Sequence, residues 1–148
     1  MITYTVAIHW SKRLVYEEAD SYSTYNCLYL YEDGYKPMYV GEAGYQTVAE
    51  RIRAHRKDGV VDRIWKYTNV TNVYVKIGFP VFEDATKYSA ALLHDVQTLI
   101  IYLEATQRDY CKANIANTVT RDTCRPGMVV KNQGDYFPLV KTYKDQPL

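Results

Sequence analysis

Five side chains of this sequence have types and spacings that suit one polar site. Tyr29 and Tyr39 lie ten residues apart, Arg51 and His55 lie four apart, and Glu104 comes much later in the chain. A guanidinium and an imidazole one helical turn apart can bind the same anionic ligand. A carboxylate beside an apolar helix face needs a cation or hydrogen-bond donors as partners. These types indicate an anion site, provided that the fold brings the three stretches together.

The two tyrosines lie in a stretch, residues 27–41, that predicts a β-hairpin. Its two apolar and aromatic runs are separated by Asp33-Gly34, a common hairpin turn. Because side chains alternate along a strand, Tyr29 and Tyr39 should share one face. The opposite face takes Leu28, Leu30, Met38 and Val40. Gly41 leaves room beside the tyrosines, although the same pattern fits an aromatic cross-strand pair that only stabilises the hairpin.

A capped helix follows the hairpin. Thr47 and Glu50 have the spacing of a capping box, which predicts a helix over about residues 48–57. Arg51 and His55 then lie one turn apart at the margin of its apolar stripe. The same positions also fit a solvated basic face shared with Arg53, Arg56 and Lys57.

Glu104 belongs to the longest helical pattern, residues 88–110. The core stripe of this predicted helix consists of Leu92, Val96, Leu99, Ile100 and Leu103. Glu104 adjoins that stripe, where it needs a partner. Taken alone, it also fits a carboxylate paired with Arg108 at position i+4.

The remaining patterns predict strands within residues 2–17, at 72–79 and at 128–130, and a short helix over 60–67. We therefore expect an α/β (α+β) fold, with a small mixed or antiparallel central sheet flanked by helices. One domain should cover residues 1–148, with a core at about 26–118, an N-terminal strand extension at 1–25 and a C-terminal extension at 119–148.

Composition narrows the class of protein. A formal net charge of +1 argues against a protein held on nucleic acid by bulk charge, although a local basic patch is compatible with it. The 16 tyrosines suit a core, a polar site or a base-stacking surface. Three cysteines without CxxC spacing indicate reduced thiols. With no signal-peptide pattern and no membrane-length apolar run, we expect a cytoplasmic protein without membrane contact.

The order of these residues resembles the GIY-YIG nuclease superfamily over roughly residues 27–117. Tyr29 matches the tyrosine of the first motif half, and Tyr39 and Gly41 match the second half, Tyr-Val-Gly. Arg51 matches the family arginine, and His55 matches the position one turn later. The later positions are Glu104 for the metal-binding glutamate and Asn117 for the asparagine after it, with Asn114 as the fallback.

The resemblance implies a metal-dependent endonuclease that hydrolyses DNA phosphodiester bonds. One Mg²⁺ (or Mn²⁺) would be held by Glu104, since a single carboxylate suffices for a hard cation that keeps its waters. Arg51 would bind the non-bridging phosphate oxygens. Tyr29 would be the general base, with its pKa lowered by Mg²⁺ and Arg51, and Tyr39 or His55 would relay or orient.

Two positions depart from the family pattern. Cys27 stands where the family has its first glycine, and Glu42 follows Tyr-Val-Gly, where an acid near the scissile phosphate is unhelpful unless it points away. A second function is therefore an inactive module on the same fold that binds nucleic acid or a protein partner. In a third, the tyrosines form an interface in a homodimer.

Overall fold

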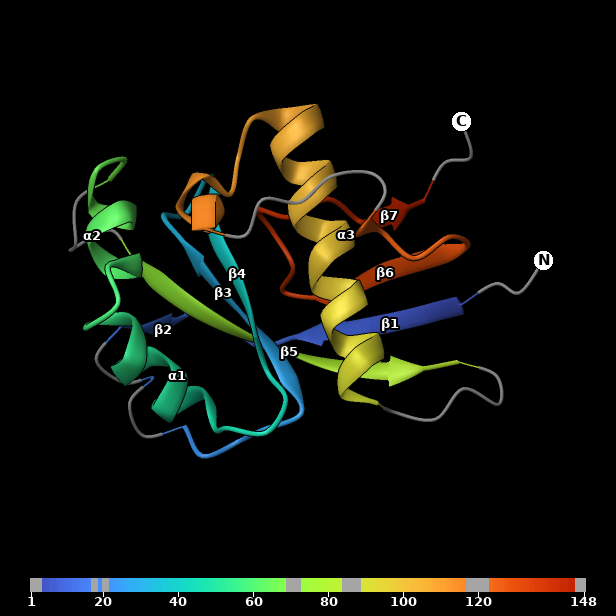
Figure 1. The fold of residues 1–148 in the computed structure, drawn as a ribbon, viewed down its shortest axis with the longest axis horizontal. Helices are drawn as coiled ribbons and strands as arrows, with labels where there is room; N and C mark the ends of the chain where they lie inside the picture. The colour runs from blue at the N-terminus through green and yellow to red at the C-terminus, as the bar shows by residue number, and fades with distance from the viewer. Residues whose placement is uncertain are drawn as a thin grey trace.

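The computed structural model describes residues 4–16, 19, 22–68, 73–83, 89–116 and 123–145. These residues form a mixed α+β fold, a curled mixed sheet with helices packed against it (Figure 1). The strands are β1 (Tyr4–Trp10), β2 (Leu14–Val15), β3 (Cys27–Glu32), β4 (Pro37–Ala43), β5 (Tyr74–Phe82), β6 (Met128–Gly134) and β7 (Thr142–Lys144). The helices are α1 (Val48–His55), α2 (Val60–Trp65), α3 (Ala90–Arg108) and the short 3₁₀ helix η3 (Lys112–Ala116).

The strand order is β4-β3-β5-β1-β6-β7, with β2 paired to β5. β4, β3 and β5 pair antiparallel, and this arrangement makes β4 an edge strand. β1 pairs antiparallel with β5 and parallel with β6. The strands expected in residues 2–17 are present, and β1 lies inside the sheet between β5 and β6. Its Trp10 indole donates a hydrogen bond of 2.8 Å to Asn132 on β6.

The predicted alternation of the hairpin is confirmed for the tyrosines and wrong for one residue. Tyr29 lies opposite Gly41, and Tyr31 lies opposite Tyr39. The register shifts between Tyr31 and Glu32, and such a shift moves a side chain to the other face. Met38 accordingly packs in the same apolar cluster as the tyrosines, and not with Leu28, Leu30 and Val40.

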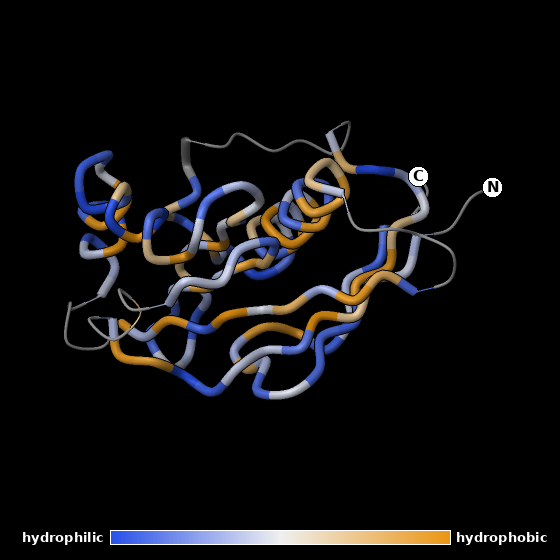
Figure 2. The backbone as a smooth tube through the Cα atoms, turned by 90° about the horizontal axis from the view of Figure 1, so that it is seen from below, coloured by the Kyte–Doolittle hydropathy of each residue, from blue (hydrophilic) through white to orange (hydrophobic). Residues whose placement is uncertain are grey.

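Two apolar clusters lie on opposite faces of β3. One joins Leu28, Leu30 and Val40 to the stripe of α3, and the other joins the tyrosines to Val48 and Ile52 of α1 and Val60 and Ile64 of α2. β3 and β4 consequently run between α1 on one side and α3 on the other (Figure 1). In Figure 2 the apolar, orange stretches of α3 lie next to apolar strand backbone.

The helix predictions hold for α1 and α2. The Thr47 hydroxyl accepts from the Glu50 amide at 3.1 Å, and the Glu50 carboxylate accepts from the Thr47 amide at 3.4 Å, so the capping box is formed. α1 ends at His55 and α2 at Trp65, close to the expected limits. Within the described part of the chain, no helix combines the length and apolarity needed to cross a bilayer.

Candidate functional site

A polar cavity of about 380 Å³, here called the edge pocket, opens above the edge strand β4 between α1, α2 and α3. It is lined by Tyr39, Glu42, Arg51, His55, Asp58, Val60, Arg63, His94 and Gln97. Its size is in the range of small-ligand sites. Two guanidinium groups and two carboxylates face one space, so the lining suits a ligand of mixed charge better than a simple anion.

Tyr29 lies directly behind the edge pocket. It is fully buried, and its hydroxyl is 2.5 Å from Nε2 of His55. The ring passes over Gly41 so closely that a Cβ at this position would overlap the ring atoms. Gly41 is therefore required for the tyrosine itself to reach His55. Burial raises the pKa of Tyr29, Tyr39 adds to that rise, and Arg51 opposes it.

His55 connects Tyr29 to Asp58. Its Nδ1 lies 3.2 Å from Oδ2 of Asp58. An ionised carboxylate only accepts, so Nδ1 carries the hydrogen and Nε2 accepts the Tyr29 hydroxyl. Burial lowers the pKa of His55, and its hydrogen bond to Asp58 opposes that change. The imidazole is therefore held neutral with one defined tautomer.

Tyr39 is the tyrosine that lines the pocket. Its ring centroid lies 5.0 Å from that of His55 and 6.3 Å from that of Tyr29. Burial raises the pKa of Tyr39, and the charge of Arg51 opposes that rise. Tyr39 thus packs beside the hydrogen-bonded series Tyr29–His55–Asp58, whose last member, Asp58, also lines the pocket.

Two polar atoms of the edge pocket are buried without a hydrogen-bond partner among the described residues. One is Nε of Arg51, whose Nη1 donates to Gln46 at 3.2 Å. The other is Oε2 of Glu42, whose Oε1 lies 3.1 Å from Nδ1 of His94. Glu42 and Arg51 also line an adjoining cavity with Tyr45, which is 91% exposed. Glu42 therefore does not point away from the site.

The structure does not bring Glu104 to the edge pocket. Glu104 is 1% exposed, and its two carboxylate oxygens accept hydrogen bonds of 2.6 and 2.5 Å from Arg108. Arg108 also donates to the carbonyl of Pro138, before β7. On α3 the residues that line the pocket are His94 and Gln97, two to three turns earlier. The i+4 pairing that the sequence allowed is the arrangement observed.

The two asparagine positions have different outcomes. Asn117 lies outside the described residues. Asn114, in η3, is buried and bonds both backbone groups of Val40, accepting from the amide and donating to the carbonyl at 3.0 Å each. Gln97 donates to the same carbonyl at 3.1 Å. These side chains cap the edge strand, which is a structural role.

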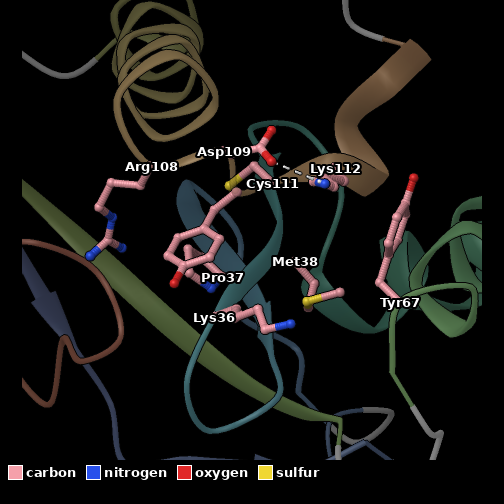
Figure 3. A pocket seen from close by; sticks show the side chains of 9 residues that line it. Lys36, Pro37, Met38, Tyr67, Arg108, Asp109, Cys111 and Lys112 are labelled. Carbon is pink, nitrogen blue, oxygen red and sulfur yellow. Dashed lines mark ion pairs between the residues drawn. The ribbon is translucent and has the colours of Figure 1, made fainter.

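A second cavity of about 230 Å³ lies at the start of β4 (Figure 3). Three of its four charged residues are already engaged. Lys112 pairs with Asp109 at 3.2 Å and lies over the ring of Tyr67, and Arg108 lies over the ring of Tyr110. The edge pocket, with its unsatisfied atoms, is the better candidate.

The geometry thus gathers Tyr29, Tyr39, Arg51 and His55 and leaves out Glu104. Sequence reasoning missed Asp58, Arg63, His94 and Gln97. The i,i+3 spacing of His55 and Asp58 at the end of α1 was the one available signal. Within the described residues, no three His, Cys, Asp or Glu side chains form a metal-binding group. No family model, curated protein or solved structure matches the chain.

Proposed function

We propose that this protein is a metal-dependent endonuclease that hydrolyses DNA phosphodiester bonds at the edge pocket. The observation that supports this most is the hydrogen-bonded series Tyr29–His55–Asp58, with Tyr39 and Arg51 beside it at the pocket. It is also the arrangement that a resemblance to GIY-YIG nucleases predicts for the hairpin and first helix. The unsatisfied donor of Arg51 suits a phosphate oxygen, which a guanidinium binds strongly.

The proposed proton path ends in the hydrogen bonds Tyr29–His55 and His55–Asp58 and begins at Tyr39, whose ring packs beside that of Tyr29. A water attacks phosphorus, and its proton passes to the Tyr39 oxygen as the bond to the leaving oxygen breaks. The Tyr39 proton moves to Tyr29, and the Tyr29 proton moves to Nε2 of His55. Asp58 stabilises the resulting imidazolium through Nδ1. The leaving oxygen takes a proton from pocket water.

This path changes the role of the first tyrosine. Tyr29 is fully buried and does not line the pocket, whereas Tyr39 does. Tyr39 is therefore the hydroxyl that contacts the attacking water, and Tyr29 transmits the proton and holds His55. A divalent cation, when bound, supplies the additional charge neutralisation that phosphodiester cleavage needs. Glu104 does not fit as its ligand, because Arg108 occupies both of its oxygens.

That occupied carboxylate favours a second candidate, a module that binds nucleic acid at the same pocket without cleaving it. Arg51 would contact phosphate in both cases. Tyr45 would stack on a base in both cases, because it is 91% exposed beside the adjoining cavity. The two candidates differ only in whether the phosphodiester bond breaks.

A plasmid-nicking assay with Mg²⁺, together with a DNA-binding measurement in EDTA, separates them. The informative pair is Arg51→Ala and the control Arg53→Ala, which removes an exposed arginine from the same helix. We expect metal-dependent nicking by wild type and Arg53→Ala and its loss in Arg51→Ala. DNA binding by wild type without nicking of duplex, branched or single-stranded substrates would favour the binding module and reject the nuclease.

A further inference from the structure

Glu42 is the acidic residue of the edge pocket whose carboxylate has one oxygen without a hydrogen-bond partner among the described residues. Its Oε1 is held by His94 at 3.1 Å, and its Oε2 is buried with no partner among the described residues. A buried carboxylate oxygen without a donor is costly to the fold. The missing partner of this oxygen is therefore expected to come with the ligand.

The neighbouring unsatisfied atom has the opposite need. Nε of Arg51 is a buried donor without an acceptor, and Arg51 and Glu42 line the same two cavities. A phosphate oxygen satisfies the donor, and a cation satisfies the carboxylate. A divalent cation bound to a phosphate satisfies both atoms at once. A phosphate alone would be repelled by the negative charge of Glu42.

The ligand chemistry of the pocket suits a hard cation. Mg²⁺ and Mn²⁺ accept carboxylate oxygens and often keep several waters, so one protein carboxylate plus a phosphate is a workable set. The His94 imidazole orients the Glu42 carboxylate by binding its other oxygen, as partners of metal-ligating groups commonly do. Glu42 lies on β4 and His94 lies on α3, so two different elements hold the carboxylate in place.

We infer that Glu42, held by His94, is the carboxylate that binds the divalent cation in this protein, in place of Glu104. The inference rests on the proposed function for its phosphate, but the cation site itself can be tested without cleavage. Glu42, Tyr39 and Arg51 line the same pocket, so the cation would lie beside the proton path and Arg51.

The test is a titration of the full chain with Mn²⁺, in which the electron paramagnetic resonance signal of free aqueous Mn²⁺ is measured. We expect saturable binding by wild type, its loss in the isosteric variant Glu42→Gln, and its retention in Glu83→Gln, a partly exposed control outside the pocket. His94→Ala should weaken binding about tenfold. Circular dichroism establishes that each variant is folded.

The result that overturns the inference is wild-type Mn²⁺ affinity in folded Glu42→Gln, or no saturable binding by wild type. Loss of binding in folded Glu104→Gln, with Glu42→Gln unaffected, would return the cation to α3. The nuclease proposal is judged separately. If wild type nicks DNA with metal and Glu42→Gln binds Mn²⁺ with wild-type affinity, only the cation site is rejected. If Mn²⁺ binding depends on Glu42 but wild type does not nick DNA, only the nuclease is rejected.

Discussion

The edge pocket and the Glu104–Arg108 pair both hold charged side chains against α3, but they differ in how completely those charges are bound. Both oxygens of Glu104 accept from Arg108, which also binds the Pro138 carbonyl. In the edge pocket, Glu42 and Arg51 each keep a buried atom without a partner. A carboxylate with a complete set of donors stabilises the fold, and one with an incomplete set has capacity for a ligand.

The largest effect that separates the two regions should come from His55→Ala. This variant removes the acceptor for Tyr29 and interrupts the proton path to Asp58. We expect the nicking rate to fall by about 10²–10⁴, the usual contribution of general acid–base groups. The stability cost should stay at about 1–3 kcal/mol, for a buried hydroxyl left without its acceptor. Initial nicking rates and urea unfolding measure the two effects.

Lys57→Ala is the control, because this exposed lysine follows the same helix outside the pocket lining. It should nick at the wild-type rate. A folded His55→Ala protein that nicks within threefold of wild type would remove His55 from the proton path and leave it a packing role.

Glu104→Gln should instead lower stability and leave the nicking rate unchanged. Arg108 loses its ionic partner, and removal of one member of a buried pair commonly costs about 3–5 kcal/mol. Arg108 is 30% exposed, so water compensates in part and we expect about 2–3 kcal/mol. Urea unfolding measures this loss. The nicking rate of the folded fraction should not change.

Simultaneous replacement of both partners tests whether the loss comes from the uncompensated arginine. Glu104→Leu with Arg108→Leu should recover most of the stability, since no buried charge remains. If Glu104→Gln instead keeps wild-type stability and loses nicking, Glu104 belongs to the reacting site and the comparison of the two regions fails.

Local rules account for what could be predicted from the sequence. The period of two in residues 27–41 placed Tyr29 and Tyr39 on one face, and the capping box started α1 so that Arg51 and His55 share a side. Both rules act over a few residues, so they need no knowledge of distant contacts.

Glu104 needed knowledge of such contacts. An apolar stripe shows which face of α3 is buried, but it does not show which turn lies beside β4. That turn carries Gln97, seven residues earlier, and seven residues are about 10 Å along a helix. The place of β1 between β5 and β6 depends on long-range pairing in the same way. Chemistry carried by separate elements is therefore harder to predict than chemistry within one.

Gly41→Ala should lower the free energy of unfolding by a moderate amount. The added methyl overlaps the Tyr29 ring, which must shift away from His55. Overpacking of this kind costs about 1–3 kcal/mol. Thermal unfolding measures the loss, and nicking should fall with it because the tyrosine is displaced. With Tyr29→Val in the same chain, the ring is gone, so the combined cost should be less than the sum of the single costs. Additive costs would mean that Gly41 acts through something other than Tyr29.

The smallest effect should be the pH dependence of stability that His55 contributes. Its pKa is lowered by burial from the ordinary 6.5. Between 6.5 and the lower folded value, the unfolded chain binds more protons than the folded one, so stability falls as pH decreases through this window. The physical cause is burial, which penalises the charged imidazolium, and the charge of Arg51 adds to the effect.

His55→Gln should remove this part of the slope, whereas His9→Gln, at an exposed histidine of β1, should retain it. Urea unfolding at a series of pH values below 7 gives the three curves. The pH dependence of stability arises from His55 only if it disappears in the His55→Gln variant. If wild type and His55→Gln have parallel curves, the imidazole is not held neutral by its surroundings. The proton path from Tyr39 would then lose its acceptor as the pH falls below the ordinary 6.5.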